Sequence, residues 1–291
     1  MATKRHGTAE DSLPAEHPPP WSTRNEAYWL LLTLRNPLPG GIYDPLEASH
    51  PACTTSSFTG GLGMIQIVRY KETPCGAYDE LLLIPGNFAV AGGCQKGKSR
   101  MRISRIYVSQ KETMYNGMSL VLKRDRTRAD SPAGRKNWNI PKHLARFEFS
   151  TAPVAKGASP PSQLTVSVFP PESSTPTAPE TVEPFFRATL TPMRYVPAFP
   201  YSTKWTSALL STIFYQPPLP AGDDKLLCAT EKWKAFDAVA ATRTARLMWV
   251  EAAGDDTVKR EDYWPEVQPW SVGMWLENAT LDIGAPEERP E

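Results

Sequence analysis

The feature that most constrains the fold is proline, which makes up 30 of the 291 residues. This is about double the usual share of ~5%. A proline removes a hydrogen bond from a helix interior, and here prolines are spread along the whole chain. Short strands joined by irregular connections are therefore expected in place of long helices. The nine Trp and ten Tyr residues indicate that the chain folds around a core.

Hydrophobic periodicity supports this expectation. Residues 61–72, "GLGMIQIVRYKE", alternate with period two, which is typical of a β-strand. One face of this strand carries Met64, Gln66, Val68 and Tyr70, and the other carries Ile65, Ile67 and Arg69. The other segments with strand character are residues 27–34, 77–91, 99–110, 143–150, 163–169, 185–193, 245–252 and 270–281. Strands of such mixed length favour a curled sheet or an open barrel.

Only one segment has helical periodicity. In residues 202–214 the apolar side chains Trp205, Leu209 and Ile213 recur at a spacing of four. With one expected helix and many strands, the fold class is mainly β (α+β), in a single domain.

The expected domain covers residues 21–282. Residues 1–20 are polar and end in "HPPP", and we expect both this segment and residues 283–291 to be disordered tails. Residues 151–184 are rich in Pro, Ser and Thr and are expected to form a long exposed connection around one strand.

Composition argues against several classes of function. The net charge of +1 gives no reason to expect nucleic acid or a membrane as a partner. The longest apolar run, "WLLLTL", is too short to span a bilayer, and no signal peptide is visible. The four cysteines include no CxxC pair and are expected to be reduced thiols in the cytoplasm. Only four histidines are present, which argues against a histidine-based metal site.

Residues 118–134 follow no strand or helix period and are rich in basic side chains. Their removal would join the flanks into "YNGRKNWNIPKH". One interpretation is a surface loop insertion, which a fold tolerates because long loops add little closure entropy. The other is a retained intron, because codons for Gly117–Ser119 and Ala133–Gly134 can carry splice-donor and splice-acceptor strings. Transcript sequencing across the segment distinguishes the two.

Lys142 lies between Pro141 and His143 in the apolar, amide-rich stretch "RKNWNIPKHLARFEFS". An amine attacks a carbonyl only when it is neutral, whereas a free lysine, with a pKa of ~10.4, is almost fully protonated at neutral pH. Burial in an apolar pocket favours the neutral amine. The residues expected to supply such a dry wall are Trp138, Ile140, Leu144 and Phe147. The alternative is an ordinary lysine that extends from a turn into water.

Three more polar residues are candidates for a site. Glu80 adjoins Asp79 on an expected strand, so the two carboxylates point to opposite faces, and either one is buried or both are strand-edge charges. Gln66 has apolar neighbours on both sides, and a buried amide there needs a partner, either a substrate or the backbone. His143 either acts as an acid, base or cation beside Lys142 or caps the turn.

Taken in order, these segments resemble the acetoacetate decarboxylase superfamily. "GRKNWNIPKHLA" is similar to that family's catalytic segment, a Gly-Arg followed by Pro-Lys-Lys-Leu, and "GAYDE" is similar to its Gly-x-Tyr-x-Glu strand. The similarity covers roughly residues 20–280, and "RYKETPCGAYDELLLIPGNF" is similar to a fungal branch of the family. The resemblance implies an acetoacetate decarboxylase-like cone-shaped β-barrel with few helices and a reactive lysine in its apolar interior.

The resemblance also implies site residues. Lys142 corresponds to the nucleophile that forms a Schiff base with a ketone, as the activated lysine of acetoacetate decarboxylase does. Glu80 corresponds to an active-site carboxylate, and Gln66, within one residue, to a second glutamate. An amide cannot ionise, so Gln66 cannot act as a general base. His143 stands where the family has a second lysine, and Arg24 is the nearest counterpart of the arginine that binds the substrate carboxylate.

Two functions from different classes stay open. The first is a lyase of secondary metabolism in which Lys142 forms a Schiff base with a small oxo compound or keto acid. Decarboxylation, aldol cleavage, dehydration or cyclisation would follow from that intermediate. The second is a non-catalytic protein that keeps the barrel as a pocket for an apolar ligand. Neither function needs a cofactor or a metal, and the resemblance implies a homo-oligomer.

Overall fold

The computed structural model describes residues 15–48, 50–51, 57–90, 97–117, 137–171, 183–207, 211–222, 229–253 and 263–289. Parts of the segments singled out in the sequence lie outside the described residues. They are residues 1–14 and 290–291 of the expected tails, the segment 118–134, residues 172–182 of the Pro/Ser/Thr-rich connection, and residues 208–210 of the expected helix.

Strands dominate the described residues, as the proline content predicts. The strands are β1 (Trp21–Leu32), β2 (Phe58–Gly60), β3 (Gly63–Glu72), β4 (Tyr78–Ile84), β5 (Asn87–Ala89), β6 (Ser99–Met101), β7 (Arg105–Val108), β8 (Lys142–Leu144), β9 (Arg146–Phe149), β10 (Leu164–Phe169), β11 (Phe186–Pro192), β12 (Phe199–Ser202), β13 (Ile213–Gln216), β14 (Trp233–Ala253), β15 (Val272–Ile283) and β16 (Glu287–Arg289). The helices are α1 (Pro45–Ala48), α3 (Lys111–Gly117) and the 3-10 helix η2 (Thr203–Thr206). The mainly β class with few helices is therefore confirmed. Within the described ranges, no helix is long and apolar enough to cross a membrane.

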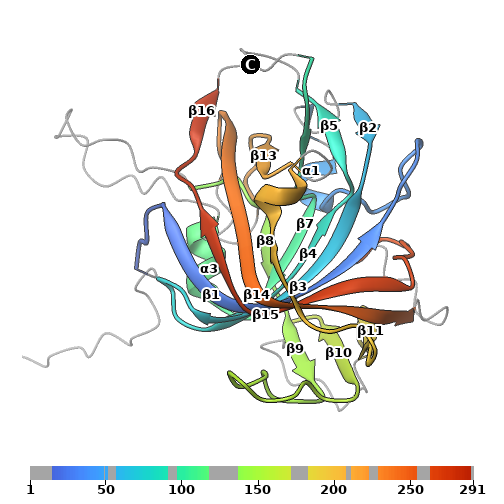
Figure 1. Cartoon of the computed structure of the whole chain (residues 1–291). Helices are drawn as coiled ribbons and strands as arrows, with labels where there is room; N and C mark the ends of the chain where they lie inside the picture. The colour runs from blue at the N-terminus through green and yellow to red at the C-terminus, as the bar shows by residue number, and fades with distance from the viewer. Residues whose placement is uncertain are drawn as a thin grey trace, which may run out of the picture.

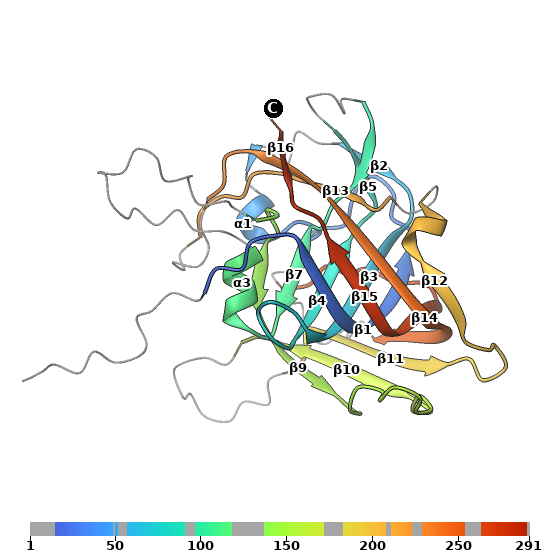
Figure 2. The ribbon, with the colours of Figure 1, turned by 60° about the vertical axis from the view of Figure 1, so that its left-hand side comes forward.

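The strands form one large mixed sheet. Its main path runs in the order β2-β5-β6-β13-β14-β15-β1-β3-β4-β7-β8. The long strand β14 joins the parts of the sheet, because along its length it pairs with β11, β12, β13, β15 and β16. The sheet is strongly curved, and β9, β10 and β11 form a second layer below it (Figures 1 and 2).

The sheet does not close into the expected barrel. Among the described residues, no hydrogen-bonded pairing joins β2 and β8, the two ends of the main path. β8 is only three residues long, and the chain then leaves this part of the sheet, since β9 pairs with β10. The helix α3 lies beside β8 at this end (Figure 1). The described strands thus form the curled, open arrangement that their mixed lengths favour, and the cone-shaped barrel that the resemblance implies is not closed.

The alternation of side chains along β3 separates two apolar cores. Met64, Val68 and Tyr70 belong to the first core, and Ile65 and Ile67 belong to the second. The predicted faces of this strand are therefore confirmed for these residues. The second core also contains the buried side chains of β10 and β11, so it fills the space between the sheet and the second layer. The first core surrounds the candidate site.

Residues 202–207 and 211–214, the described parts of the segment 202–214, do not form the expected helix. In the first part Thr203–Thr206 make a 3-10 turn, in which the Ser202 hydroxyl accepts from the backbone N–H of Lys204 at 3.4 Å. Residues 208–210 lie outside the described residues. The chain then enters β13, which pairs with β14 and buries Phe214 in the first core. Strand pairing thus overrides the helical spacing of the apolar residues.

The structure also differs from the expected tails. Glu287–Arg289 form β16, which pairs with Trp233–Ala235 of β14 although the sequence there is polar. On the N-terminal side, the backbone N–H of His17 donates to Oδ1 of Asn116 at 2.6 Å. Ordered contacts therefore extend beyond residues 21–282 on both sides.

Candidate active site

Lys142 begins β8 and points into the first apolar core. Its backbone lies opposite Ile106 of β7 in a parallel pairing. Only 4% of Lys142 is exposed, so it is not a lysine that extends from a turn into water. The amine is held inside the protein.

The Lys142 amine has two polar partners. Nζ donates to Oε2 of Glu80 at 3.0 Å and to Oγ1 of Thr113 at 3.0 Å. Glu80 comes from β4 and Thr113 from α3, and both residues are buried. A single charge in an apolar interior is strongly unfavourable, so the amine and the carboxylate depend on each other for compensation.

Two tyrosines complete the surroundings of the Glu80 carboxylate. The hydroxyl of Tyr70 donates to Oε1 at 3.2 Å, and the hydroxyl of Tyr78 donates to Oε2 at 3.5 Å. Burial raises the pKa of both phenols well above the ordinary value of 10, and the negative charge of Glu80 raises it further. Both tyrosines therefore stay protonated near neutral pH and serve as donors.

A pocket with a cavity volume of about 90 Å³ opens at the Lys142 amine. This is several times the ~10–15 Å³ that one water molecule needs. Its walls are mostly aromatic and aliphatic. Examples are Trp29, Leu82, Phe214 and Phe236. Among the described lining residues, Glu80 and Lys142 are the only charged ones.

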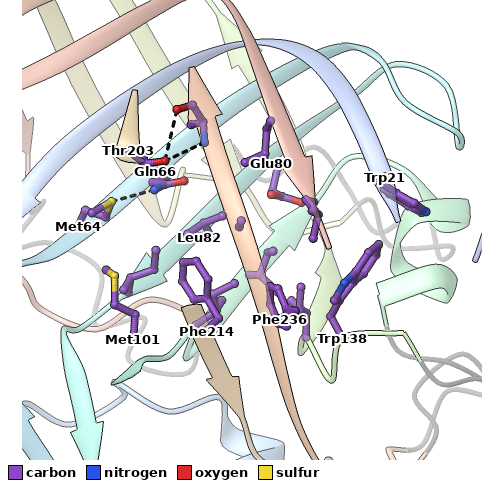
Figure 3. A pocket seen from close by; sticks show the side chains of 18 of the residues that line it. Trp21, Met64, Gln66, Glu80, Leu82, Met101, Trp138, Thr203, Phe214 and Phe236 are labelled. Carbon is purple, nitrogen blue, oxygen red and sulfur yellow. Dashed lines mark hydrogen bonds between the residues drawn. The ribbon is translucent and has the colours of Figure 1, made fainter. Parts of the chain in front are cut away.

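In Figure 3 Gln66 lies on the Met64 side of the pocket and Glu80 on the side of Trp21 and Trp138, with Leu82 between them. The strand register places Gln66, Leu82, Ile106 and Lys142 in one row across β3, β4, β7 and β8. All four residues line the pocket. Three inter-strand spacings, about 14 Å along the curved sheet, separate the backbones of Gln66 and Lys142. The Lys142 side chain crosses part of this span, because its amine contacts Glu80 of β4.

Side-chain hydrogen bonds anchor residues 137–139, which lead the chain to Lys142. The acceptors are backbone carbonyls: His17 for Asn137, Gly284 for Trp138, and Pro217 and Lys232 for Asn139. Asn139 has a φ of 52°, a left-handed conformation that asparagine tolerates better than most residues. Anchors on four separate segments therefore fix the start of β8.

The structure does not bring His143 to the pocket. Successive residues of a strand point to opposite faces, so His143 points away when Lys142 faces the pocket. Nε2 of His143 lies 2.8 Å from Oδ2 of Asp44, and the ring lies 6.3 Å from that of Tyr107 in the second core. The expected role of His143 as an acid, base or cation beside the Lys142 amine is therefore corrected.

Arg24 is not at the pocket either. Its side chain is 72% exposed and forms a surface ion pair with Glu72 at 3.4 Å. The start of β1 alternates between buried and exposed residues, and Trp21, which lines the pocket, is on the buried side. Arg24 falls on the exposed side, so the substrate-binding role expected of it is corrected.

The four apolar residues expected to surround Lys142 lie only partly where they were predicted. Trp138 and Ile140 line the pocket, and Leu144 packs against the first core. Phe147 packs against the second core, because the chain passes into the second layer after β8.

Three residues of the site were not singled out in the sequence. Tyr78 is two residues from Glu80 on β4 and so shares its face, and Tyr70 lies opposite Tyr78 on β3. Period-two alternation along the two strands could have predicted that both tyrosines face the same side as Glu80. Thr113 lies on α3, and no pattern in the sequence predicted this helix.

The fold and the site together define a class of protein: a curved, mainly β sheet with a buried lysine–carboxylate pair in an apolar pocket. No protein-family model and no curated protein matches the chain. Solved structures do match it. An acetoacetate decarboxylase-like enzyme from Sphingomonas wittichii RW1 is similar over 99% of both chains, with a TM-score of 0.53 and 12% identity.

Two further solved structures share the fold. An acetoacetate decarboxylase is similar over 98% of this chain and 95% of its own, with a TM-score of 0.52 and 11% identity. The enduracididine biosynthesis enzyme MppR, complexed with the condensation product of pyruvate and imidazole 4-carboxaldehyde, is similar over 96% of this chain and 97% of its own, with a TM-score of 0.51 and 12% identity. The chain therefore has the acetoacetate decarboxylase-like fold.

Proposed function

We propose that this protein is a lyase in which Lys142 forms a Schiff base with an oxo compound. The observation that carries the proposal is the burial of the Lys142 amine at an apolar pocket, 3.0 Å from the Glu80 carboxylate. An amine in this setting can pass its proton to the carboxylate and attack a carbonyl carbon that enters the pocket.

Glu80 lies where it can accept and return the proton of this reaction. Glu80 accepts one proton from the ammonium, and the neutral amine then adds to the carbonyl carbon while a proton moves from its nitrogen to the carbonyl oxygen. The carboxylic acid returns the proton to the hydroxyl of the resulting carbinolamine, which leaves as water. The product is a protonated imine beside the Glu80 carboxylate. Tyr70 and Tyr78 hold that carboxylate in place through their hydroxyl groups.

The protonated imine then serves as an electron sink. It accepts the electron pair of a carbon–carbon bond that breaks next to it, whether the leaving part is CO₂ or an aldehyde. The similar enzyme MppR holds the condensation product of pyruvate and an aldehyde. This supports an oxo compound as the substrate of the present protein.

The proposal is tested by trapping the imine with borohydride. We expect a covalent adduct on Lys142 in a site-resolved mass spectrum after reduction in the presence of pyruvate, acetoacetate or 4-phenylbutan-2-one. Lys142→Arg is the matched variant, because a guanidinium keeps the positive charge beside Glu80 but forms no such imine. The proposal would be contradicted if none of the three compounds gave an adduct. It would also be contradicted if Lys142→Arg and Lys142→Ala gave as much adduct as the native protein.

A second candidate is a non-catalytic protein that binds an apolar ligand. The mostly apolar lining and the neutral Gln66 in place of a carboxylate favour it. It predicts that Lys142→Met retains an apolar ligand with unchanged affinity and that no borohydride adduct forms in the native chain.

A further inference from the structure

The charges around the pocket narrow the class of substrate. Lys142 and Glu80 are the only charged side chains among the described lining residues, and they already form an ion pair with each other. Arg24 is exposed and bound to Glu72. The described lining therefore holds no cation that is left over for the carboxylate of a substrate.

We propose that the pocket selects an uncharged ketone or aldehyde with an apolar body over a keto acid anion. The reaction of this compound rests on the proposed function of Lys142, whereas the preference for an uncharged ligand is a property of the pocket alone. The class of reaction that follows is cleavage or formation of a carbon–carbon bond next to the carbonyl, without loss of CO₂.

The preference for an uncharged carbonyl compound follows from the charges in the pocket before and after imine formation. When a neutral ketone condenses with Lys142, the ammonium is replaced by an iminium of the same charge, one water leaves, and the pair with Glu80 persists. A keto acid adds a carboxylate, so the apolar pocket then contains two anions and one cation. A buried carboxylate without a partner is strongly unfavourable.

The end of the pocket at Gln66 offers a neutral hydrogen-bonding group. Nε2 of Gln66 lies 2.8 Å from Sδ of Met64, and this is the only hydrogen bond of the side-chain amide within the described part of the chain. A thioether is a weak acceptor, so an oxygen atom of a ligand is the better partner. Leu82 and Ile106 separate Gln66 from Lys142. A matching substrate has its carbonyl at Lys142, an apolar middle, and a neutral oxygen at the far end.

The first test measures the charge preference without any covalent step. Tryptophans 21, 29 and 138 line the pocket, so quenching of their fluorescence reports binding. The probes are 4-phenylbutan-2-ol and 3-hydroxy-5-phenylpentanoate, which differ by one carboxylate. We expect the neutral alcohol to bind at least about tenfold more tightly. Equal affinity, tighter binding of the acid, or no binding of the alcohol would overturn the inference. Arg24→Ala is the control and should leave the ratio unchanged.

The second test compares the matched carbonyl compounds in borohydride trapping. The probes are 4-phenylbutan-2-one and 3-oxo-5-phenylpentanoate, and loss of CO₂ from the acid gives the ketone. We expect the ketone to label Lys142 at least about tenfold faster and the protein not to accelerate decarboxylation of the acid. Faster labelling or decarboxylation of the acid overturns the inference and leaves the proposed function standing. If neither compound labels Lys142, pyruvate and acetoacetate do not label it either, and the alcohol still binds, the proposed function has failed and the charge preference has not.

The third test concerns Gln66. In the native protein we expect 4-(4-hydroxyphenyl)butan-2-ol to bind about tenfold more tightly than 4-phenylbutan-2-ol, because its hydroxyl reaches the Gln66 amide. In Gln66→Leu this ratio should fall to about one. A ratio that is one in the native protein, or that stays at ten in Gln66→Leu, would remove Gln66 from the substrate site.

Discussion

At the scale of single residues, the site depends on the mutual compensation of Lys142 and Glu80. Both are almost fully buried, and the distance between Nζ and Oε2 is 3.0 Å. Such a pair contributes little net stability, because the attraction offsets the loss of hydration. Removal of one partner is different, since the other is left as an unpaired buried charge.

A double-mutant cycle measures this dependence. We expect Lys142→Met to lower the free energy of unfolding by about 3 kcal/mol at neutral pH, because Glu80 loses its cation. Glu80→Gln in the same chain should restore most of that loss, since an amide needs no counter-charge. Urea denaturation of the two single variants and the double variant gives the coupling energy. Additive effects of the two substitutions would show that the residues do not interact in solution.

At the scale of elements, the segment 137–139 sets the entry into β8. Asn139 combines a φ of 52° with two hydrogen bonds from Nδ2 to backbone carbonyls, at 3.0 Å and 2.7 Å. The carbonyls belong to Pro217 and Lys232, which lie far away in the sequence. The element that positions Lys142 is therefore held by tertiary contacts and not by local propensity.

Two substitutions at Asn139 separate the contribution of the backbone from that of the side chain. Asn139→Gly keeps the left-handed conformation without strain but loses both hydrogen bonds. Asn139→Ala loses the same bonds and adds a strain of roughly 1 kcal/mol. We expect both variants to unfold at lower urea concentration, with Asn139→Ala the less stable by about 1 kcal/mol. Equal midpoints for the two variants would argue against the left-handed conformation.

At the scale of the whole molecule, the stability of the fold should depend on pH through Glu47. This residue of α1 is fully buried, with Oε2 3.4 Å from Nη2 of Arg102. Burial raises its pKa from the ordinary 4.5 to about 8, although the positive charge of Arg102 acts in the opposite direction. The folded state then holds a proton that the unfolded chain has already lost, so stability decreases as the pH rises between these values.

Glu47→Gln removes this titration. We expect the free energy of unfolding of the native protein to fall by a few kcal/mol between about pH 4.5 and 8, relative to the variant. Below the ordinary Glu47 pKa of 4.5, which applies to the unfolded chain, the free energies of unfolding of the two proteins should differ least. Urea denaturation across this range measures the effect, with the exposed Glu72→Gln as control. Parallel profiles for the native protein and Glu47→Gln would contradict the assignment.

The sequence predicted the strands better than their assembly. Period-two alternation identified β3 and β4 and the face of Gln66, because side-chain direction in a strand is a local property. The curled sheet was predicted correctly, but not that the cone-shaped barrel stays open, because closure depends on pairing between distant strands. For the described parts of 202–214 the expected helix was wrong for the same reason, since pairing with β14 determines the conformation of Ile213 and Phe214.

Prediction of the site was limited by the direction of side chains across the sheet. Motif order placed Lys142 and Glu80 together, and the structure has them in contact. Adjacency in sequence wrongly suggested that His143 assists its neighbour, whereas strand geometry sends it to Asp44. Thr113 could not be predicted from the sequence, because it comes from a short helix that only tertiary packing brings to Lys142.

The bond from Trp138 to the carbonyl of Gly284 has a consequence for biosynthesis. The chain emerges from the ribosome in order, so Lys142 appears long before β15, which supplies Leu281 and Ile283 to the pocket and ends next to the Gly284 carbonyl. Until translation has passed Gly284, the lysine lacks part of its apolar enclosure. The apolar enclosure of the Lys142 amine is therefore complete only when β15 has been synthesised and has docked.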